Sequence, residues 1–269
     1  MRRTPRVLTA VVAAAALLVS GIGAAASAPL VPAPAAPATT GDQAVGLVNP
    51  FIGSQGDGNT FPGAVAPFGM AQPSPDTGHN TGYSYTDTAI RGFSMVHISG
   101  VGCGLGGDLP MLPTTGVPTS GDDAAYALPF SHVEEQASPG YYGVTLTAPG
   151  GPVRAEMTAT TRTGWQRYTF PATADATVLI NTGQALHEVT SSQATVVDDR
   201  TIETTVTGQG FCQTTRPYTL HFVTRFDRPF ATTGTWADST FTPGSTQTSG
   251  AGRRGARLRR SASALDSTK

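Results

Sequence analysis

The sequence predicts an all-β protein whose main body is a large antiparallel β-sandwich. After Gly140 it contains runs of about four to nine residues rich in Val, Thr, Tyr, Phe and Ile, which favour strands. Turn residues separate these runs at intervals of about ten residues, a spacing typical of an antiparallel sandwich. After the N-terminal segment no stretch sustains helical periodicity over three turns, so helices are expected to be short or absent.

Residues 1–28 have the features of an export signal peptide. They combine three arginines, an apolar run that begins at Val7, and small residues suited to signal peptidase at Ala26 and Ala28. A membrane anchor is the alternative, but the many Ala and Gly residues make the run only weakly hydrophobic. We expect a secreted protein with no stable membrane association after cleavage, exported by the general or the twin-arginine route.

The main domain is expected to follow a short linker. Residues 29–44 form a Pro- and Ala-rich linker, because closely spaced prolines block both helix and sheet. Residues 45–248 suffice for one large β domain with a sizeable core. Its clearest strands are expected at 141–149, 153–162, 165–171, 176–183 and 218–226. In the first of these, Val144 and Leu146 alternate with threonines, which predicts one buried and one solvated face.

Residues 249–269 differ abruptly in composition. Five arginines lie between positions 253 and 260, and apolar residues are few. We expect a disordered Arg-rich tail, and the change suggests a shifted reading frame because the pattern of the domain stops near Phe241. The alternative is an arm that binds nucleic acid or membrane through clustered arginines.

The charge of the domain argues against nucleic acid as its partner. The whole chain has a formal net charge of −1, but residues 29–250 hold 8 basic and 17 acidic residues. An acidic domain repels phosphate.

The two cysteines, Cys103 and Cys212, allow one disulfide in an exported protein. Two separate buried thiols are equally compatible with the sequence. No CxxC pair occurs and the five histidines are scattered, so a zinc site is not indicated.

The stretch from Val48 to Gly116 carries the densest local information. Gly, Pro, Asn and Asp interrupt apolar and aromatic residues every few positions, so its backbone is specified in detail. Six carboxylates in or near it are candidates for acid and base chemistry, namely Asp57, Asp76, Asp87, Asp108, Glu134 and Glu135. They form no recognisable pair, and aspartates often close turns by bonding to their own backbone. The sequence therefore assigns no catalytic residue.

Eight motifs of this stretch occur in a familiar order: NPFIG, GNTFPGA, PFGM, SPDT, GYSYTD, GFS, HISGVGC and GD. This series resembles the N-terminal domain of glycoside hydrolase family 92, the calcium-dependent α-mannosidases. The resemblance covers about Val48 to Trp236. It implies a β-sandwich of the galactose-mutarotase-like kind. The helical (α/α)6 catalytic domain of the family has no counterpart in this sequence.

The resemblance also implies how the chain would contact sugar. In the family the general acid, the carboxylates that activate water and most of the calcium site belong to the helical domain, so no calcium is expected in this chain alone. The N-terminal domain supplies one wall of the sugar pocket. The residues expected to approach a sugar are Phe51, Gly53, Asp57, Asn59, Asp76 and Tyr83. For the phenylalanines, including Phe51, a role in the core is the alternative.

The sequence thus predicts the N-terminal carbohydrate-contacting domain of a secreted α-mannosidase-like hydrolase, truncated before its catalytic domain. Its partners would be mannose-containing glycans and the missing helical domain, and the chain alone should be inactive. The alternative is a stand-alone secreted carbohydrate-binding module. A sugar epimerase is a third possibility, but it needs an acid and a base in one pocket, and no pair of His and Glu stands out in the sequence.

Overall fold

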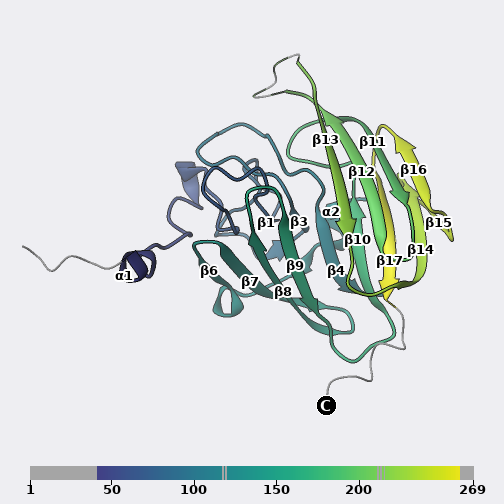
Figure 1. The fold of residues 1–269 in the computed structure, drawn as a ribbon, viewed down its shortest axis with the longest axis horizontal. Helices are drawn as coiled ribbons and strands as arrows, with labels where there is room; N and C mark the ends of the chain where they lie inside the picture. Colours follow the sequence, from purple (N-terminus) through teal and green to yellow (C-terminus); the bar gives the residue numbers. More distant parts are fainter. Residues whose placement is uncertain are drawn as a thin grey trace, which may run out of the picture. The chain divides into compact units, whose positions relative to one another are not determined.

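The computed structural model describes residues 41–116, 118, 120–210, 212, 214 and 216–260, and most of its regular elements are strands (Figure 1). The helical elements among these residues are short: α1 (Gly41–Val45), α2 (Asp123–Tyr126) and the 3-10 turns η1 (Gly56–Gly58) and η2 (His132–Glu134). Asp122 caps α2, because its carboxylate accepts a hydrogen bond from the backbone N–H of Ala124. The expectation of short helices is confirmed for the described residues.

Seven strands form a central antiparallel sheet in the order β1-β3-β4-β10-β17-β14-β15. Their bounds are β1 (Ser74–Asp76), β3 (Gly92–Ser94), β4 (Met111–Thr115), β10 (Ala176–Asn181), β14 (Phe230–Ala237), β15 (Thr240–Pro243) and β17 (Arg254–Arg260). The order is not sequential, so segments distant in the chain meet at the centre of the molecule.

Two further antiparallel sheets have four strands each. The first, in the order β6-β7-β8-β9, consists of β6 (Gln136–Ser138), β7 (Tyr141–Ala148), β8 (Gly151–Ala159) and β9 (Gly164–Thr169). The second, in the order β13-β12-β11-β16, consists of β11 (Val189–Val196), β12 (Thr201–Gly208), β13 (Tyr218–Arg225) and β16 (Gln247–Gly250). A short pair joins β2 (Ala89–Ile90) to β5 (Leu128–Pro129).

The middle of the central sheet is buried on both faces, and all six residues of β10 are buried. Leu179 packs in a core cluster with Leu146 of β7, whereas its neighbour Ile180 packs in a second cluster with Ile202 of β12. Because successive side chains of a strand point to opposite faces, the two four-stranded sheets cover opposite sides of the central one. Each such Leu or Ile stabilises the fold by about 1.5–3 kcal/mol. The predicted antiparallel sandwich is confirmed.

The prediction of disorder from residue 249 is wrong as far as Arg260. Residues 249 and 250 end β16, and β17 lies between β10 and β14 in the central sheet. Ala256 and Leu258 are buried in the second core cluster, at 0% and 2% exposure. The domain therefore extends beyond the predicted boundary at residue 248. The rest of the predicted tail, 261–269, lies outside the described residues, as do the predicted signal peptide, 1–28, and residues 29–40 of the predicted linker. The last residues of that predicted linker, 41–44, lie in the short helix α1 instead of an extended segment.

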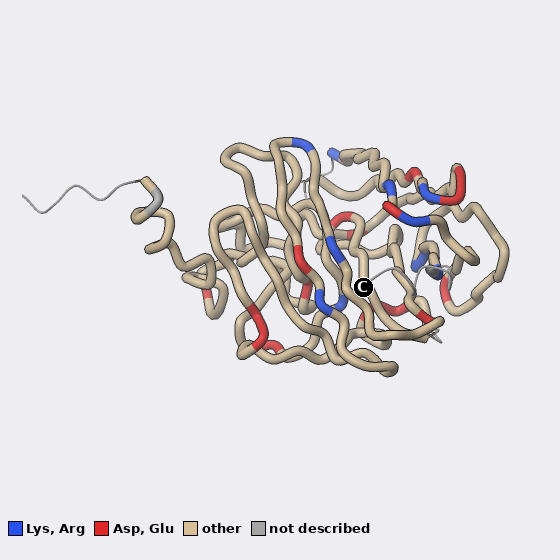
Figure 2. Tube along the Cα trace, turned by 60° about the horizontal axis from the view of Figure 1, so that its bottom comes forward, with Lys and Arg blue, Asp and Glu red and all other residues tan. Residues whose placement is uncertain are grey.

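Two arginines of β17, Arg257 and Arg259, lie on the other face of the strand from Ala256 and Leu258. The guanidinium of Arg257 lies 4.1 Å from the ring centre of Phe241, and Arg259 forms a 2.9 Å ion pair with Asp175. Burial, with the charge of Arg259, lowers the pKa of Arg257. Acidic and basic residues lie close together in several places in Figure 2. Local pairing thus offsets charges that the composition alone presents as a basic tail.

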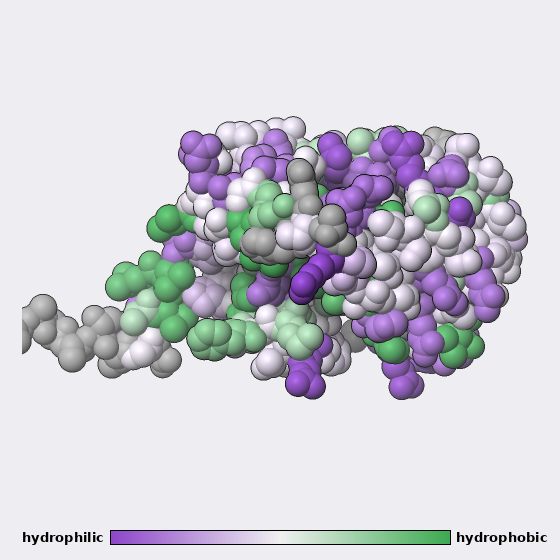
Figure 3. All heavy atoms as spheres, turned by 90° about the horizontal axis from the view of Figure 1, so that it is seen from above, coloured by the Kyte–Doolittle hydropathy of each residue, from purple (hydrophilic) through white to green (hydrophobic). Residues whose placement is uncertain are grey.

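Exposed apolar side chains gather where the described chain begins. Val45, Leu47, Val48 and Ile52 are all more than half exposed. Figure 3 shows hydrophobic surface, in green, at the left end of the described part of the molecule. None of the helices in the described part of the chain is both long and apolar enough to cross a membrane.

Candidate functional site

The motif-rich stretch folds into loops that bind one another. The backbone N–H of Tyr85 donates to the carbonyl of Ser54 (2.8 Å), and that of Gly100 donates to the carbonyl of Asn59 (2.6 Å). The side-chain amide of Asn80 donates to the carbonyl of Gly102 (3.1 Å). Three loops, residues 51–61, 77–87 and 98–107, therefore form one unit, which we call the loop cluster.

Two predicted sugar-contacting residues have the left-handed backbone that makes this packing possible. Gly53 has φ of +79° and Asn59 has φ of +54°. Between them, Gly58 packs so tightly that a Cβ atom there would lie 2.2 Å from the carbonyl oxygen of Gly53. Asn59 donates from Nδ2 to the carbonyl of Asp57 (3.0 Å), and Asp57 itself is exposed at the tip of the turn. The structure thus places Asp57 where a ligand can reach its carboxylate.

Asp76 is buried and bound to neighbouring protein groups. Its Oδ1 lies 3.0 Å from Nε2 of His97, and its Oδ2 accepts the backbone N–H of Ser94 (3.0 Å). The other ring nitrogen of His97 lies 2.9 Å from the carbonyl oxygen of Gln72. Asp76 therefore joins β1 to β3 and to His97, which directly precedes the third loop of the cluster.

Tyr83 is also buried, with 1% of its surface exposed. Its hydroxyl donates to Oε2 of Glu135 (2.9 Å). Burial, together with the charge of Glu135, raises its pKa, so the phenol stays protonated and acts as a donor. The ring of Phe51 is half-buried, with its centre 6.5 Å from that of Tyr83 and 5.5 Å from that of Tyr85. The six predicted residues thus divide into a buried pair, Asp76 and Tyr83, and four at the surface of the loop cluster.

Three residues around this cluster, Tyr85, His132 and Glu135, are not among the six predicted sugar contacts. Of the three, the sequence indicates Glu135 only as a candidate carboxylate. Nδ1 of His132 lies 2.6 Å from Oε2 of Glu135, and the His132 ring stacks on that of Tyr85 at 4.1 Å. The GYSYTD motif includes Tyr85, and it is the sequence signal that could have indicated this residue.

A second buried network lies beneath the glycine-rich loop. Oδ1 of Asp108 is 3.0 Å from Nε2 of His187, and Oδ2 of Asp108 accepts the hydroxyl of Tyr218 (2.8 Å). Nδ1 of His187 faces the carbonyl oxygen of Glu188 at 3.0 Å. Burial alone would lower the pKa of His187, but the hydrogen bond and charge of Asp108 raise it overall. This network links β13 and the loop before β11 to the loop cluster.

The structure joins Cys103 to Cys212, with the two sulfurs 1.97 Å apart. Cys103 lies between Gly102, which binds Asn80, and Gly104, which packs on the carbonyl of Leu186. The bond therefore attaches the loop cluster to the connection between β12 and β13.

The hollows in the described part of the chain include a small cavity and a larger open groove. A cavity of about 180 Å³ is lined by side chains that include Asp76, Asn80, Arg91, Asp123 and Gln184. Arg91 and Asp123 form an ion pair of 3.5 Å across it. Burial raises the pKa of Asp123, which Arg91 opposes. This cavity borders the loop cluster, so it belongs to the candidate site.

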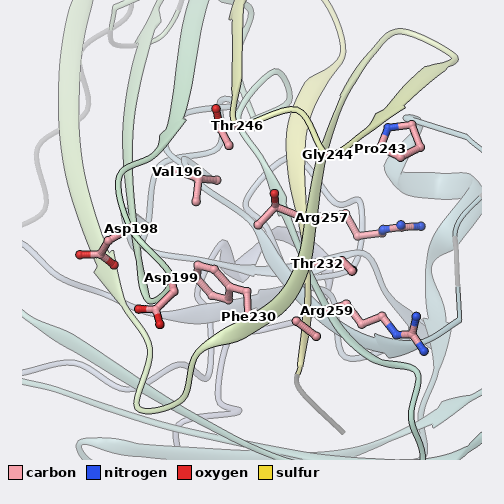
Figure 4. Close-up of a pocket in the computed structure, with 12 residues that line it drawn as sticks. Val196, Asp198, Asp199, Phe230, Thr232, Pro243, Gly244, Thr246, Arg257 and Arg259 are labelled. Atoms are coloured by element: carbon pink, nitrogen blue, oxygen red, sulfur yellow. The ribbon is translucent and has the colours of Figure 1, made fainter.

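The larger hollow, an open groove of about 590 Å³, lies elsewhere, between the turn after β11 and strands β14 and β17. In Figure 4 its acidic residues, Asp198 and Asp199, lie on one side and Arg257 and Arg259 on the other. The charges do not converge on a common point, and none of the predicted sugar-contacting residues lines it. We place the site at the loop cluster for this reason.

Among the residues that the structure describes, no three His, Cys, Asp or Glu side chains lie together as a candidate metal site. Both carboxylate oxygens of Asp76 and of Asp108 already face protein groups. We assign no chemical step of this chain to calcium.

Comparison with solved structures shows the same architecture in larger proteins. The chain superposes on the GH92 family glycosyl hydrolase ccman5 with a TM-score of 0.74 and 34% identity, over 82% of this chain and 31% of that one. It superposes on the family GH92 α-mannosidase BT3965 from Bacteroides thetaiotaomicron with a TM-score of 0.72 and 30% identity, over 81% of this chain and 31% of that one. The latter has also been solved in complex with mannoimidazole.

Sequence comparison agrees. A protein of Arthroderma benhamiae named "Uncharacterized secreted glycosidase" is 29% identical over 137 residues, which are 46% of this chain and 17% of that protein. The chain thus spans about a third of the solved structures and a smaller share of this relative. The profile described as "Glycosyl hydrolase family 92 N-terminal domain" matches residues 47–264, which include the loop cluster, the three sheets and β17. The chain belongs to glycosyl hydrolase family 92, as its N-terminal domain.

Proposed function

We propose that this chain is the carbohydrate-contacting domain of an exported α-mannosidase-like hydrolase and that its loop cluster forms one wall of the sugar site. Exposed Asp57 and half-buried Asn59 supply polar groups that read hydroxyls, and Phe51 supplies an aromatic surface. The observation that carries the proposal is the rigid left-handed turn from Gly53 to Asn59, which holds these groups without help from another domain.

The substrate class proposed is a mannose-containing glycan. Two of the similar structures are titled as α-mannosidases, one of them with mannoimidazole bound, and the curated relative is named a secreted glycosidase. Hydrolysis of a glycosidic bond ordinarily needs two carboxyl groups on either side of it. At the loop cluster Asp57 is exposed, whereas Asp76 is buried and bound to His97 and Ser94. We therefore propose that the chain binds sugar and does not cleave it.

The test measures sugar binding by NMR, for the wild-type chain and for Asp57→Ala. The ligands are methyl α-mannoside and soluble mannan. Wild type is expected to bind weakly, with a Kd of about a millimolar or above, and Asp57→Ala to bind less tightly. The matched control is Asp227→Ala, which removes an exposed carboxylate far from the loop cluster in the sequence. Equal binding by all three proteins would remove Asp57 from the site, and no binding by wild type would refute the proposal.

Hydrolysis is measured with 4-nitrophenyl α-mannoside, with calcium and with a chelator. We expect no turnover above background in either case. Turnover that depends on calcium would contradict the assignment, because it would require metal and acid groups within this chain.

The alternative is that the chain works as a carbohydrate-binding module by itself. The hydrogen bonds between the three loops favour it, because they hold the loop cluster together within this chain. A module would be monomeric and would saturate with sugar at a defined stoichiometry. Analytical ultracentrifugation with and without mannan distinguishes a monomeric binding module from a domain that needs a second domain.

A further inference from the structure

A buried carboxylate lies beneath the aromatic edge of the loop cluster. The side chain of Glu135 is 1% exposed. Its Oε2 accepts from the hydroxyl of Tyr83 (2.9 Å) and lies 2.6 Å from Nδ1 of His132, while its Oε1 accepts from the hydroxyl of Tyr142 (2.6 Å). Such a group is costly to bury unless each oxygen has donors, and here three donors surround it.

This arrangement determines how His132 is presented. Burial and the charge of Glu135 raise the pKa of Tyr83 and Tyr142, so both phenols remain donors. Since the oxygens of Glu135 act as acceptors, Nδ1 of His132 carries the proton that faces them. In the neutral ring Nε2 is then an acceptor. We find no bond to Nε2 from the described residues, and the His132 side chain is 29% exposed.

Aromatic rings fix His132 from two further sides. The ring of Tyr85 stacks on it at 4.1 Å with 18° between the planes, and the ring of Phe130 meets it edge-on at 5.0 Å. Phe51 in turn packs its edge against Tyr85, at 5.5 Å and 67°. Tyr85 is 38% exposed, in contrast to the buried Tyr83. The outer surface of this stack therefore offers the exposed part of the Tyr85 ring beside one imidazole nitrogen.

The stack is continuous with the proposed sugar site. The backbone N–H of Tyr85 donates to the carbonyl of Ser54, which follows Gly53 directly. A pyranose has an apolar face of C–H groups and a rim of hydroxyls. An exposed tyrosine ring can cover the apolar face, and an oriented imidazole nitrogen can accept a hydrogen bond from one of the hydroxyls.

We propose that Tyr85 and His132 form a saccharide subsite, in which the Tyr85 ring covers a sugar face and Nε2 of His132 accepts a hydrogen bond from a sugar hydroxyl. Glu135 is a positioning residue, because it holds His132 in the required tautomer and does not reach the surface. This inference rests on the proposed function and replaces the predicted contact at Tyr83 by one at Tyr85.

The experiment compares Tyr85→Ala and His132→Ala with two matched controls, Trp165→Ala and His221→Ala, which remove an exposed aromatic and an exposed imidazole from distant strands. Binding of methyl α-mannoside and of soluble mannan is followed by ligand-observed NMR. We expect about a tenfold weaker Kd for Tyr85→Ala, a smaller loss for His132→Ala, and no change in either control. Thermal melts show whether each variant remains folded.

Glu135→Gln tests positioning by a readout that is independent of stability. In wild-type protein with ¹⁵N-labelled histidine, the NMR chemical shift of Nε2 of His132 should change when methyl α-mannoside is added. In Glu135→Gln the two ring nitrogens should show a mixture of tautomers before any sugar is added. An unchanged His132 tautomer in the folded variant would overturn the positioning role of Glu135.

The outcomes separate the two proposals. If wild type binds and Tyr85→Ala and His132→Ala bind equally well, the subsite is wrong while the proposed function stands. If wild type binds neither probe up to about 50 mM, far above a millimolar Kd, the proposed function fails and the subsite with it.

Discussion

At the scale of single residues, the buried ion pair of Asp108 and His187 makes stability depend on pH. Both nitrogens of His187 face acceptors, so the protonated ring is favoured in the folded state. Its folded pKa is raised, whereas the unfolded value is about 6.5. The stabilisation is therefore fully present below about pH 6.5 and is lost as the pH rises through the folded pKa.

This gives a first prediction. Urea unfolding of wild type between about pH 6 and 9 should show a decreasing free energy of unfolding as His187 loses its proton. The decrease should be absent in His187→Gln. If His187→Gln shows the same pH dependence as wild type, the decrease in the free energy of unfolding belongs to other groups. The matched control is His221→Gln, whose ring is exposed and should leave the slope unchanged.

A second prediction concerns the donors of Glu135. Tyr83→Phe removes one hydroxyl from a buried carboxylate and should reduce the free energy of unfolding by about 1–3 kcal/mol. Tyr85→Phe, at a more exposed ring, should change it by less than about 0.5 kcal/mol. Chemical denaturation of both variants checks this, and similar losses in both would contradict the account of the network.

The sequence could predict the backbone of the loop cluster better than the contacts of its side chains. Gly53 and Asn59 are residue types that tolerate left-handed backbone, so a turn there is predictable locally. The burial of Tyr83 depends on Glu135, which is 52 residues away in the chain, and that of Asp76 on His97, 21 residues away. Partners at such separations leave no local pattern, so the sequence could not show which motif residues face inward.

At the scale of elements, β17 shows how composition can hide a strand. In RGARLRR the apolar residues alternate with arginines, which is a strand pattern, yet the charge of the segment suggested disorder. Two of its arginines have partners beside the strand, Phe241 for Arg257 and Asp175 for Arg259. Those partners come from two other segments, so the sequence could not reveal them.

The third prediction follows from the position of β17. Leu258→Ala should cost about 2–5 kcal/mol of unfolding free energy, since the side chain is 2% exposed in the second core cluster. Arg259→Ala removes an ion pair whose two side chains are 39% and 60% exposed, so it should cost less than about 1 kcal/mol. Equal costs in urea titrations would indicate that β17 contributes by charge instead of by packing.

The fourth prediction concerns the disulfide between elements. Reduction should lower the free energy of unfolding by about 2–5 kcal/mol, because the bond closes a long loop. Intact-mass spectra before and after reductant establish the bond, and the Cys103→Ser, Cys212→Ser double variant should be insensitive to reductant. A wild type with two free thiols under native conditions would refute the pairing.

At the scale of the whole molecule, the sequence predicted the class of fold because the strand signals repeat along the chain. The run that became β10, rich in Val, Leu and Ile, was predictable as a strand, and the alternating runs of β7 and β13 fitted sheets with one solvated face. The order of strands in the central sheet could not be predicted, because pairing of β17 with β10 and β14 depends on contacts between distant segments.

That order has a consequence for synthesis. The ribosome releases β10 and then β14 well before β17, yet these two strands meet only through β17. Until Arg254–Arg260 has left the exit tunnel, β10 and β14 each present an unpaired edge to the surroundings. A nascent chain halted before this segment should therefore be a substrate for chaperones, and completion of the sheet should coincide with arrival of its last described strand.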